Sequence, residues 1–186
     1  MKKRNFIKMF SKDCLFLINQ STTEVLVDGC SEKTFVRGSR CSQRNWYENG
    51  TKYLKRNWKN GLADGAGREW RRNGQMLHKF ICKNGNHNGL EQGWYESGQK
   101  HYERNWKDGF KEGLEQYWYE NGQILLECNR KNGQKDGLER RWFESGQIFA
   151  ECSWKNGIID GAERGWLKTG QQKYEYIWKN GVLMEW

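Results

Sequence analysis

Eight glutamates recur at a fixed interval, and their spacing is the strongest indication of chemistry in this sequence. They form two series with a step of twenty-four residues: Glu91, Glu115, Glu139 and Glu163, and Glu103, Glu127, Glu151 and Glu175. Each member of the first series lies twelve residues before a member of the second, so a hairpin that turns midway would place the two carboxylates opposite one another. Paired carboxylates of this kind occur in glycoside hydrolases and in calcium sites.

An acidic strip on one face of a sheet has three interpretations, because opposed like charges destabilise a sheet unless a cation lies between them. We favour a solvated face on which Arg140, Arg141, Arg164 and neighbouring lysines screen the carboxylates. The alternatives are a ladder of bound calcium ions and a strip that docks a basic partner surface, imitating phosphate if the partner is a nuclease. If the strip is unpaired, replacing Glu115 and Glu139 with glutamine is expected to raise stability.

No other group of residues matches a catalytic motif. Five of the six aspartates stand immediately before a glycine, where a turn explains them. The three histidines, at positions 78, 87 and 101, occupy unrelated positions, and no serine or cysteine is placed as their nucleophile partner by a known motif. The glycines have hairpin spacing and do not form a phosphate-binding loop. We therefore expect a non-enzymatic protein without cofactor or metal.

A second candidate surface is an aromatic series beside the tryptophans, formed by Tyr47, Tyr95, Tyr119 and Phe143, with Tyr117 nearby. Exposed aromatic residues among charges are typical interface anchors, although cross-strand aromatic pairs also stabilise a sheet that binds nothing. The predicted partner-binding residues are therefore the eight glutamates together with Tyr95, Tyr117, Tyr119, Phe143 and Arg141.

A repeated element must position these residues. Tryptophans at 46, 70, 94, 118, 142 and 166 and glycines at 50, 74, 98, 122, 146 and 170 keep the same step of twenty-four, which gives about six copies in residues 41–186. Each copy has two extended segments separated by glycine turns, so it predicts one β-hairpin. Glu120-Asn121-Gly122 suits a three-residue loop closed by a left-handed glycine.

The loop length predicts which side chains face one another. It places Trp118 opposite Ile124, Gln116 opposite Leu126 and Leu114 opposite Cys128, giving one mostly apolar face that carries the indoles. A lone hairpin is marginal, so the copies must pair edge to edge. We expect an all-β fold: an elongated, curved antiparallel sheet of about six 24-residue hairpin repeats in residues 41–186, preceded by an irregular N-terminal cap in residues 1–40.

Composition limits the location and the partners. The basic start is interrupted by Lys8, Lys12 and Asp13, which argues against a secretory signal, and no stretch approaches the length of a membrane span. Six cysteines without a CxxC pair fit a reduced, cytoplasmic setting. A net charge of +9 permits acidic partners. Single-stranded nucleic acid is one alternative, although the lysines and arginines form no dense tract.

The segments W-Y-E-N-G-Q and W-K-N-G-x-x-D-G-L-E resemble the bacterial variant of the MORN repeat, over about three quarters of the chain. The resemblance implies stacked hairpins that form a curved sheet, and many bacterial proteins of this kind are identified as YwqK-type antitoxins. We interpret the chain as a bacterial or phage protein that binds and inhibits a partner, as an antitoxin, immunity protein or anti-defence inhibitor, with a toxin, nuclease or defence effector as target. A membrane-surface or assembly scaffold is the alternative, and the terminal edge around residues 178–186 would allow a dimer.

Overall fold

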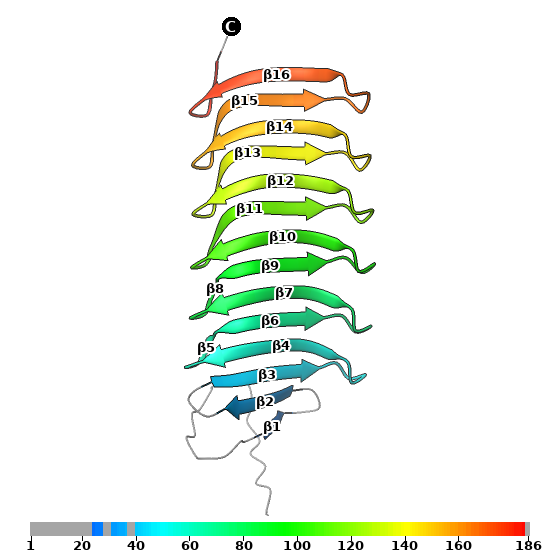
Figure 1. Ribbon diagram of the computed structural model, residues 1–186, viewed down its shortest axis with the longest axis vertical. Coiled ribbons are helices and arrows are strands. Elements are labelled where there is room, and N and C mark those ends of the chain that lie inside the picture. The colour runs from blue at the N-terminus through cyan, green and yellow to red at the C-terminus, as the bar shows by residue number, and fades with distance from the viewer. Residues whose placement is uncertain (1–23, 28–30, 37–39, 185–186) are drawn as a thin grey trace, which may run out of the picture. The chain divides into compact units, whose positions relative to one another are not determined.

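A computed structural model of the chain describes residues 24–27, 31–36 and 40–184 (Figure 1). Within these residues all regular elements are strands and there is no helix. The chain divides into two compact units, Met1–Asn86 and His87–Trp186. In each unit the neighbouring strands pair antiparallel, so the predicted all-β fold of hairpin repeats is confirmed.

The first unit contains seven described strands and a small apolar cluster. The strands are β1 (Glu24–Val27), β2 (Ser31–Val36), β3 (Arg40–Trp46), β4 (Lys52–Lys59), β5 (Leu62–Ala63), β6 (Gly65–Trp70) and β7 (Met76–Lys83). Ala63, Phe80 and Cys82 are buried against Trp58. Within the predicted cap, β1 and β2 form a hairpin and β2 pairs with β3, whereas the remainder of residues 1–39 lies outside the described residues. The short strand β8 (Asn86–His87) spans the division between the units.

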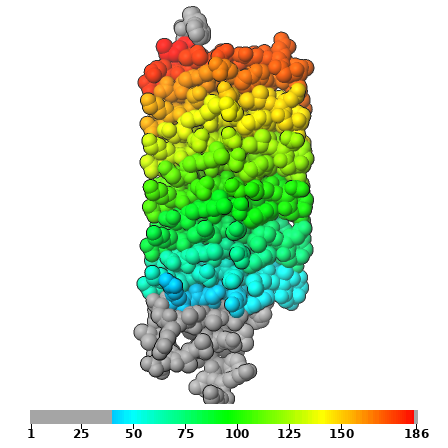
Figure 2. Space-filling view, in the orientation of Figure 1, coloured from blue at the N-terminus to red at the C-terminus, as the bar shows by residue number. Residues whose placement is uncertain are grey.

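The second unit is itself a series of hairpins. Its strands are β9 (Gly89–Trp94), β10 (Lys100–Lys107), β11 (Phe110–Trp118), β12 (Ile124–Lys131), β13 (Gln134–Trp142), β14 (Ile148–Lys155), β15 (Ile158–Trp166), β16 (Gln172–Lys179) and β17 (Val182–Leu183). Each strand pairs with the next along the chain. In Figure 2 the side chains of successive repeats in this unit, coloured green to red, pack closely on the face shown.

Two kinds of glycine turn join the strands, and the predicted one is confirmed. Tyr119 N–H donates to the Gln123 carbonyl at 2.8 Å and Gly122 N–H to the Tyr119 carbonyl at 3.0 Å. Gly122 has a φ of 86°, the left-handed conformation that closes a three-residue loop. At the other end of each hairpin, Asn132 and Gly133 have φ angles of 50° and 82°, which define a two-residue type I′ turn.

A β-bulge beside each three-residue loop changes the predicted register. Trp118 lies opposite Ile124 as predicted, but the register then shifts, and Tyr117 pairs with Leu126. Leu125 is therefore an extra residue on β12. A single extra residue moves every later side chain of that strand to the other face, so all pairings predicted beyond the bulge need correction.

The predicted glutamate pairs and the predicted apolar pairs are wrong beyond this bulge. Glu115 lies opposite Cys128, and Glu127 lies opposite Gln116. Likewise Glu91 faces Arg104 and Glu103 faces Gln92, Glu139 faces Cys152 and Glu151 faces Arg140, and Glu163 faces Tyr176 and Glu175 faces Arg164. The two glutamate series therefore lie on opposite faces of the second unit.

The tryptophans of the second unit are also divided between the faces. We call the side with Glu91, Glu115, Glu139 and Glu163 the carboxylate face; Trp106, Trp154 and Trp178 lie there, since Trp106 and Trp178 donate to Glu91 and Glu163. Alternation along the strands places Trp94, Trp118, Trp142 and Trp166 on the opposite, tryptophan face. The prediction of a single dry face for all indoles is wrong. Buried apolar side chains among the described residues are confined to Ala63, Phe80, Cys82 and Cys128.

Candidate binding surface

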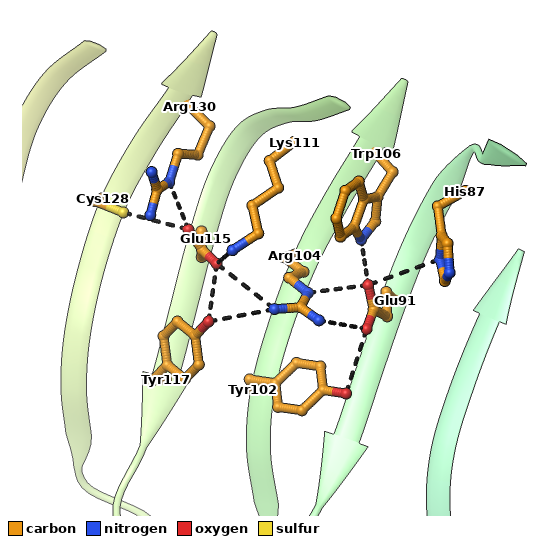
Figure 3. A network of polar contacts seen from close by, with 10 residues as sticks. All are labelled: His87, Glu91, Tyr102, Arg104, Trp106, Lys111, Glu115, Tyr117, Cys128 and Arg130. Atoms are coloured by element: carbon orange, nitrogen blue, oxygen red, sulfur yellow. Dashed lines mark hydrogen bonds and ion pairs between the residues drawn. The ribbon is translucent and has the colours of Figure 1, made fainter. Parts of the chain in front are cut away.

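Glu91 is the first carboxylate of a hydrogen-bonded network on the carboxylate face (Figure 3). Its side chain accepts from Arg104 Nε at 2.9 Å and Nη2 at 2.6 Å, and from the Tyr102 hydroxyl at 3.3 Å. Trp106 Nε1 donates to the same carboxylate. Arg104 Nη1 also lies 4.0 Å from Glu115 Oε1, so one guanidinium bridges the carboxylates of two successive repeats.

Glu115 is the most enclosed of these carboxylates, with 1% of its surface exposed. It accepts from Lys111 Nζ at 2.5 Å, Arg130 Nε at 2.6 Å and the Tyr117 hydroxyl at 2.9 Å, and Cys128 Sγ lies at 3.7 Å. Burial raises the pKa of a carboxyl group, but the hydrogen bonds from Lys111, Arg130 and Tyr117 outweigh it and lower the pKa of Glu115 below its ordinary value. The group is therefore held ionised.

Three of the four carboxylates of this series accept a hydrogen bond from a residue fifteen positions downstream. Trp106 donates to Glu91, Arg130 to Glu115, and Trp178 to Glu163 at 2.8 Å. Glu139 instead binds Arg141 Nε at 2.8 Å and Lys135 Nζ at 2.5 Å. The carboxylates of this face are thus partners of the chain's own cations and indoles, and the interpretation of a solvated acidic face is wrong for Glu91, Glu115 and Glu139, which are buried.

The second glutamate series is paired on the tryptophan face. Glu103 accepts from Lys100 and Gln92, each at 2.7 Å, and the lysine bond lowers the pKa of Glu103. Glu127 accepts from Gln116 at 2.9 Å. Arg140 binds Glu151 at 2.9 Å, and Arg164 binds both Glu151 at 3.3 Å and Glu175 at 2.8 Å. The predicted continuous acidic strip therefore does not form. The hypothesis that the strip imitates phosphate loses the arrangement of carboxylates on which it rested.

Three of the predicted aromatic anchors connect one hairpin loop to the next. The hydroxyl of Tyr95 donates to the Trp118 carbonyl at 2.7 Å, and that of Tyr119 to the Trp142 carbonyl at 2.8 Å. Tyr47 donates to the Trp70 carbonyl at 3.0 Å in the first unit. We call this contact the tyrosine latch. These residues are half-buried, so they stabilise the array whether or not they also contact a partner.

Loss of one latch has a measurable expected effect. Tyr119→Phe is expected to reduce the free energy of unfolding by about 1 kcal/mol, because it removes one hydrogen bond to a backbone carbonyl. Urea denaturation followed by tryptophan fluorescence measures the change. Tyr176→Phe is the matched control, since that ring is 44% exposed, and it is expected to change stability by no more than a few tenths of a kcal/mol. Equal effects for the two variants would contradict the latch.

Phe143 occupies the latch position in the next repeat but has no hydroxyl to donate to Trp166. A shallow hollow of about 380 Å³ lies at this point, lined by Phe143, Phe149, Trp166, Leu167, Lys168, Lys173 and Tyr174. Sequence reasoning treated Phe143 as one more member of the tyrosine series and missed this hollow. The change from tyrosine to phenylalanine at position 143 was the sequence signal that could have indicated the hollow.

Two of the described cysteines, Cys128 and Cys152, are expected to react slowly as thiols. The cysteines at 41, 82, 128 and 152 are free, and burial raises the pKa of both Cys128 and Cys152 to about 11. At pH 8 about one thiol in a thousand would be ionised. We expect iodoacetamide to modify both residues far more slowly in the folded chain than in urea, as measured by peptide mass spectrometry. Rapid modification of Cys128 in the folded chain would contradict its burial.

In the part of the chain that the structure describes, no group of three or more histidine, cysteine, aspartate or glutamate side chains is arranged to hold a metal ion. Each carboxylate that the calcium interpretation needed has a nitrogen donor instead. None of the described segments forms a helix long and apolar enough to cross a membrane.

Three repeats of the second unit match a known family model. The MORN repeat variant model matches residues 88–108, 111–132 and 135–156. These three MORN matches are consecutive and contain Glu91, Arg104, Glu115 and Glu139. MORN repeats indicate a repeat-based binding module of a generally non-catalytic class. No curated protein matches the chain.

Proposed function

We propose that the chain is a non-catalytic protein-binding module that restrains a partner protein in the cytoplasm, as an antitoxin, immunity protein or anti-defence inhibitor does. The observation that supports this most is the network on the carboxylate face. Glu91, Arg104 and Glu115 are fixed by several charge-assisted hydrogen bonds each. A network that fixes the strands beneath an interface reduces the conformational entropy lost on binding, which favours affinity for a rigid partner.

The form of the surface favours a protein over a small molecule. The hollow at Phe143 is shallow and lies beside rows of half-buried aromatic and charged side chains. Small ligands are bound in pockets that enclose most of their surface, whereas protein interfaces bury about 800 Å² per partner. Tyr95, Tyr117, Arg141 and Phe143 are of the residue types that carry most binding energy in such interfaces.

The proposal is tested by affinity capture followed by an activity measurement. The immobilised full chain is expected to retain one protein from an extract of its native host in a fixed ratio, and the purified chain to lower that protein's activity. Capture of nothing above the background of an unrelated basic protein would exclude the proposal. A captured partner with unchanged activity would identify a scaffold instead of an inhibitor.

One observation favours the scaffold alternative. Along the type I′ turns of the second unit, Phe110, Ile158 and Val182 are 60%, 52% and 65% exposed, and exposed lysines precede them. Exposed apolar side chains beside cations suit an anionic membrane surface. Sedimentation with vesicles of phosphatidylserine and phosphatidylcholine, compared with phosphatidylcholine alone, separates this function from inhibition. Only a membrane-surface scaffold requires selective binding to the anionic vesicles.

A further inference from the structure

The hollow at Phe143 forms where the tyrosine latch is interrupted. In the two preceding repeats of the second unit, the hydroxyls of Tyr95 and Tyr119 bind the carbonyl of the next repeat's tryptophan. Phe143 cannot make this bond to Trp166. The space between the two hairpin loops is hollowed at the same place, so the sequence change and the geometry coincide.

The lining of the hollow is apolar on its inner side. The rings of Phe143 and Phe149 are 5.1 Å apart and tilted by 40°, and Tyr174 lies opposite Gly165, where a Cβ would overlap its ring. The glycine lets Tyr174 lie flat against the sheet. These three rings form a surface that fits one apolar side chain of a partner.

The rim of the hollow is basic, in contrast to the equivalent loops. Lys168 stands where earlier repeats have Glu96, Glu120 and Glu144, and Lys173 stands where they have His101, Leu125 and Phe149. Lys168 Nζ lies 5.9 Å from the Phe143 ring. Within the described ranges neither lysine has an ion pair, unlike Lys100, Lys111 and Lys135, and no acidic residue lines the hollow.

We propose that this hollow docks an acidic segment of the partner protein. One apolar side chain of the segment packs on Phe143, Phe149 and Tyr174, and flanking carboxylates bind Lys168 and Lys173. Two cations without their own counter-charge beside an apolar surface complement an acidic peptide with an apolar anchor. The inference rests on the proposed function, because it specifies which kind of segment of the partner protein the chain binds.

A peptide fits this site better than single-stranded nucleic acid. A nucleic-acid strand needs a cationic groove with successive stacking platforms. The preceding loops instead present Glu96, Glu120 and Glu144, which would repel the phosphates of a strand that ran from the hollow across these loops. A peptide needs only the single hollow and its two lysines.

Fluorescence anisotropy with a short labelled peptide tests the site. The probe is a phenylalanine flanked on each side by two acidic residues, compared with the same peptide carrying serine in place of phenylalanine and with a labelled thymidine decamer. We expect the full chain to bind the phenylalanine probe at least tenfold more tightly than the serine peptide. The double variant Lys168→Glu/Lys173→Glu is expected to weaken binding at least tenfold.

Two further variants separate docking from general charge. Phe143→Tyr restores the latch without changing charge and is expected to weaken binding several-fold. The control Lys107→Glu/Lys131→Glu makes the same charge change at exposed residues that end β10 and β12, and it is expected to leave binding within about twofold. Circular dichroism and melting temperature verify that each variant is folded.

Three outcomes would contradict the proposal that the hollow docks an acidic segment. These are no binding of the phenylalanine probe, equal loss in the control and in the Lys168→Glu/Lys173→Glu variant, or tighter binding of the thymidine decamer. If the Lys168→Glu/Lys173→Glu chain still captures and inhibits the partner of the wild-type chain, the hollow is not the docking site and the proposed function stands. If the wild-type chain captures no partner, the proposed function fails and the probe alone decides whether the hollow binds acidic peptides.

Discussion

Replacing Glu115 with alanine is expected to lower the free energy of unfolding by about 3 kcal/mol, because removing one member of a buried ion pair leaves its partners without counter-charge. Lys111 and Arg130 would each lose their carboxylate, and Arg104 would lose one of the two that it bridges. All three cations are more than three-quarters buried, so water would solvate them only in part. Urea denaturation with tryptophan fluorescence measures the loss.

The matched control for this prediction is Glu127→Ala. Glu127 accepts a hydrogen bond from Gln116 at 2.9 Å on the tryptophan face, so its loss is expected to cost about 1 kcal/mol. Comparing the two variants also decides whether Glu115 belongs to a buried hydrogen-bonded network or to an unpaired acidic face. A gain in stability for Glu115→Ala or Glu115→Gln would restore the idea of an unpaired acidic face and would exclude the buried network.

The contribution of Glu115 is expected to depend on pH in a defined direction. Its folded pKa lies below the ordinary value of 4.5, so the native state binds a proton less readily than the unfolded state. The stabilisation is therefore fully present above pH 4.5 and is lost as the pH falls through the lower folded pKa. The stability difference between the wild-type chain and Glu115→Ala should shrink below pH 4.5 and stay constant from there to neutral pH. A difference that increases in acid would contradict this sign.

The hairpins were predictable because their signal is local. A glycine at position 122, three residues after Tyr119, fixes a left-handed turn by itself. The pairing of the glutamates was not predictable from the same reasoning, because Leu125 in the bulge is an ordinary strand residue and only the geometry of the sheet shows that it is unpaired. Simple alternation counted across Leu125 then placed Glu115 and Glu127 on one face instead of two.

The contacts of the tyrosines on the candidate surface were predictable only in part, for a related reason. The positions of Tyr95 and Tyr119 in a column were correct, but their hydroxyl bonds to the following repeat depend on distances between loops that alternation does not provide. The replacement of tyrosine by Phe143 has meaning only once those bonds are known. The sequence also contained a spacing of fifteen residues between Glu91, Glu115 and Glu163 and their donors. That spacing becomes a recognisable signal once the register is corrected.

The first unit replaces an ion pair of the network by an apolar contact, and this exchange leads to the second large prediction. Gly67 and Phe80 stand twenty-four residues before Glu91 and Arg104, and they pair directly across β6 and β7. The Phe80 ring lies over Gly67, where a Cβ would overlap its carbons, and only 2% of Phe80 is exposed. The absence of a side chain at Gly67 therefore allows Phe80 to fill the place that a carboxylate has in the second unit.

Gly67→Ala is accordingly expected to destabilise the first unit by about 2 kcal/mol, because the added methyl group overpacks a site whose aromatic ring is fixed by Ala63, Cys82 and Trp58. Thermal unfolding monitored by near-ultraviolet circular dichroism measures the effect. In Gly67→Ala/Phe80→Leu the shorter side chain leaves room for the methyl group. The double variant is therefore expected to lose less free energy of unfolding than the sum of the losses in the two single variants. If the stability losses of the two single variants simply add, or if Gly67→Ala does not change stability, the Phe80 ring can move aside and does not require a glycine at position 67.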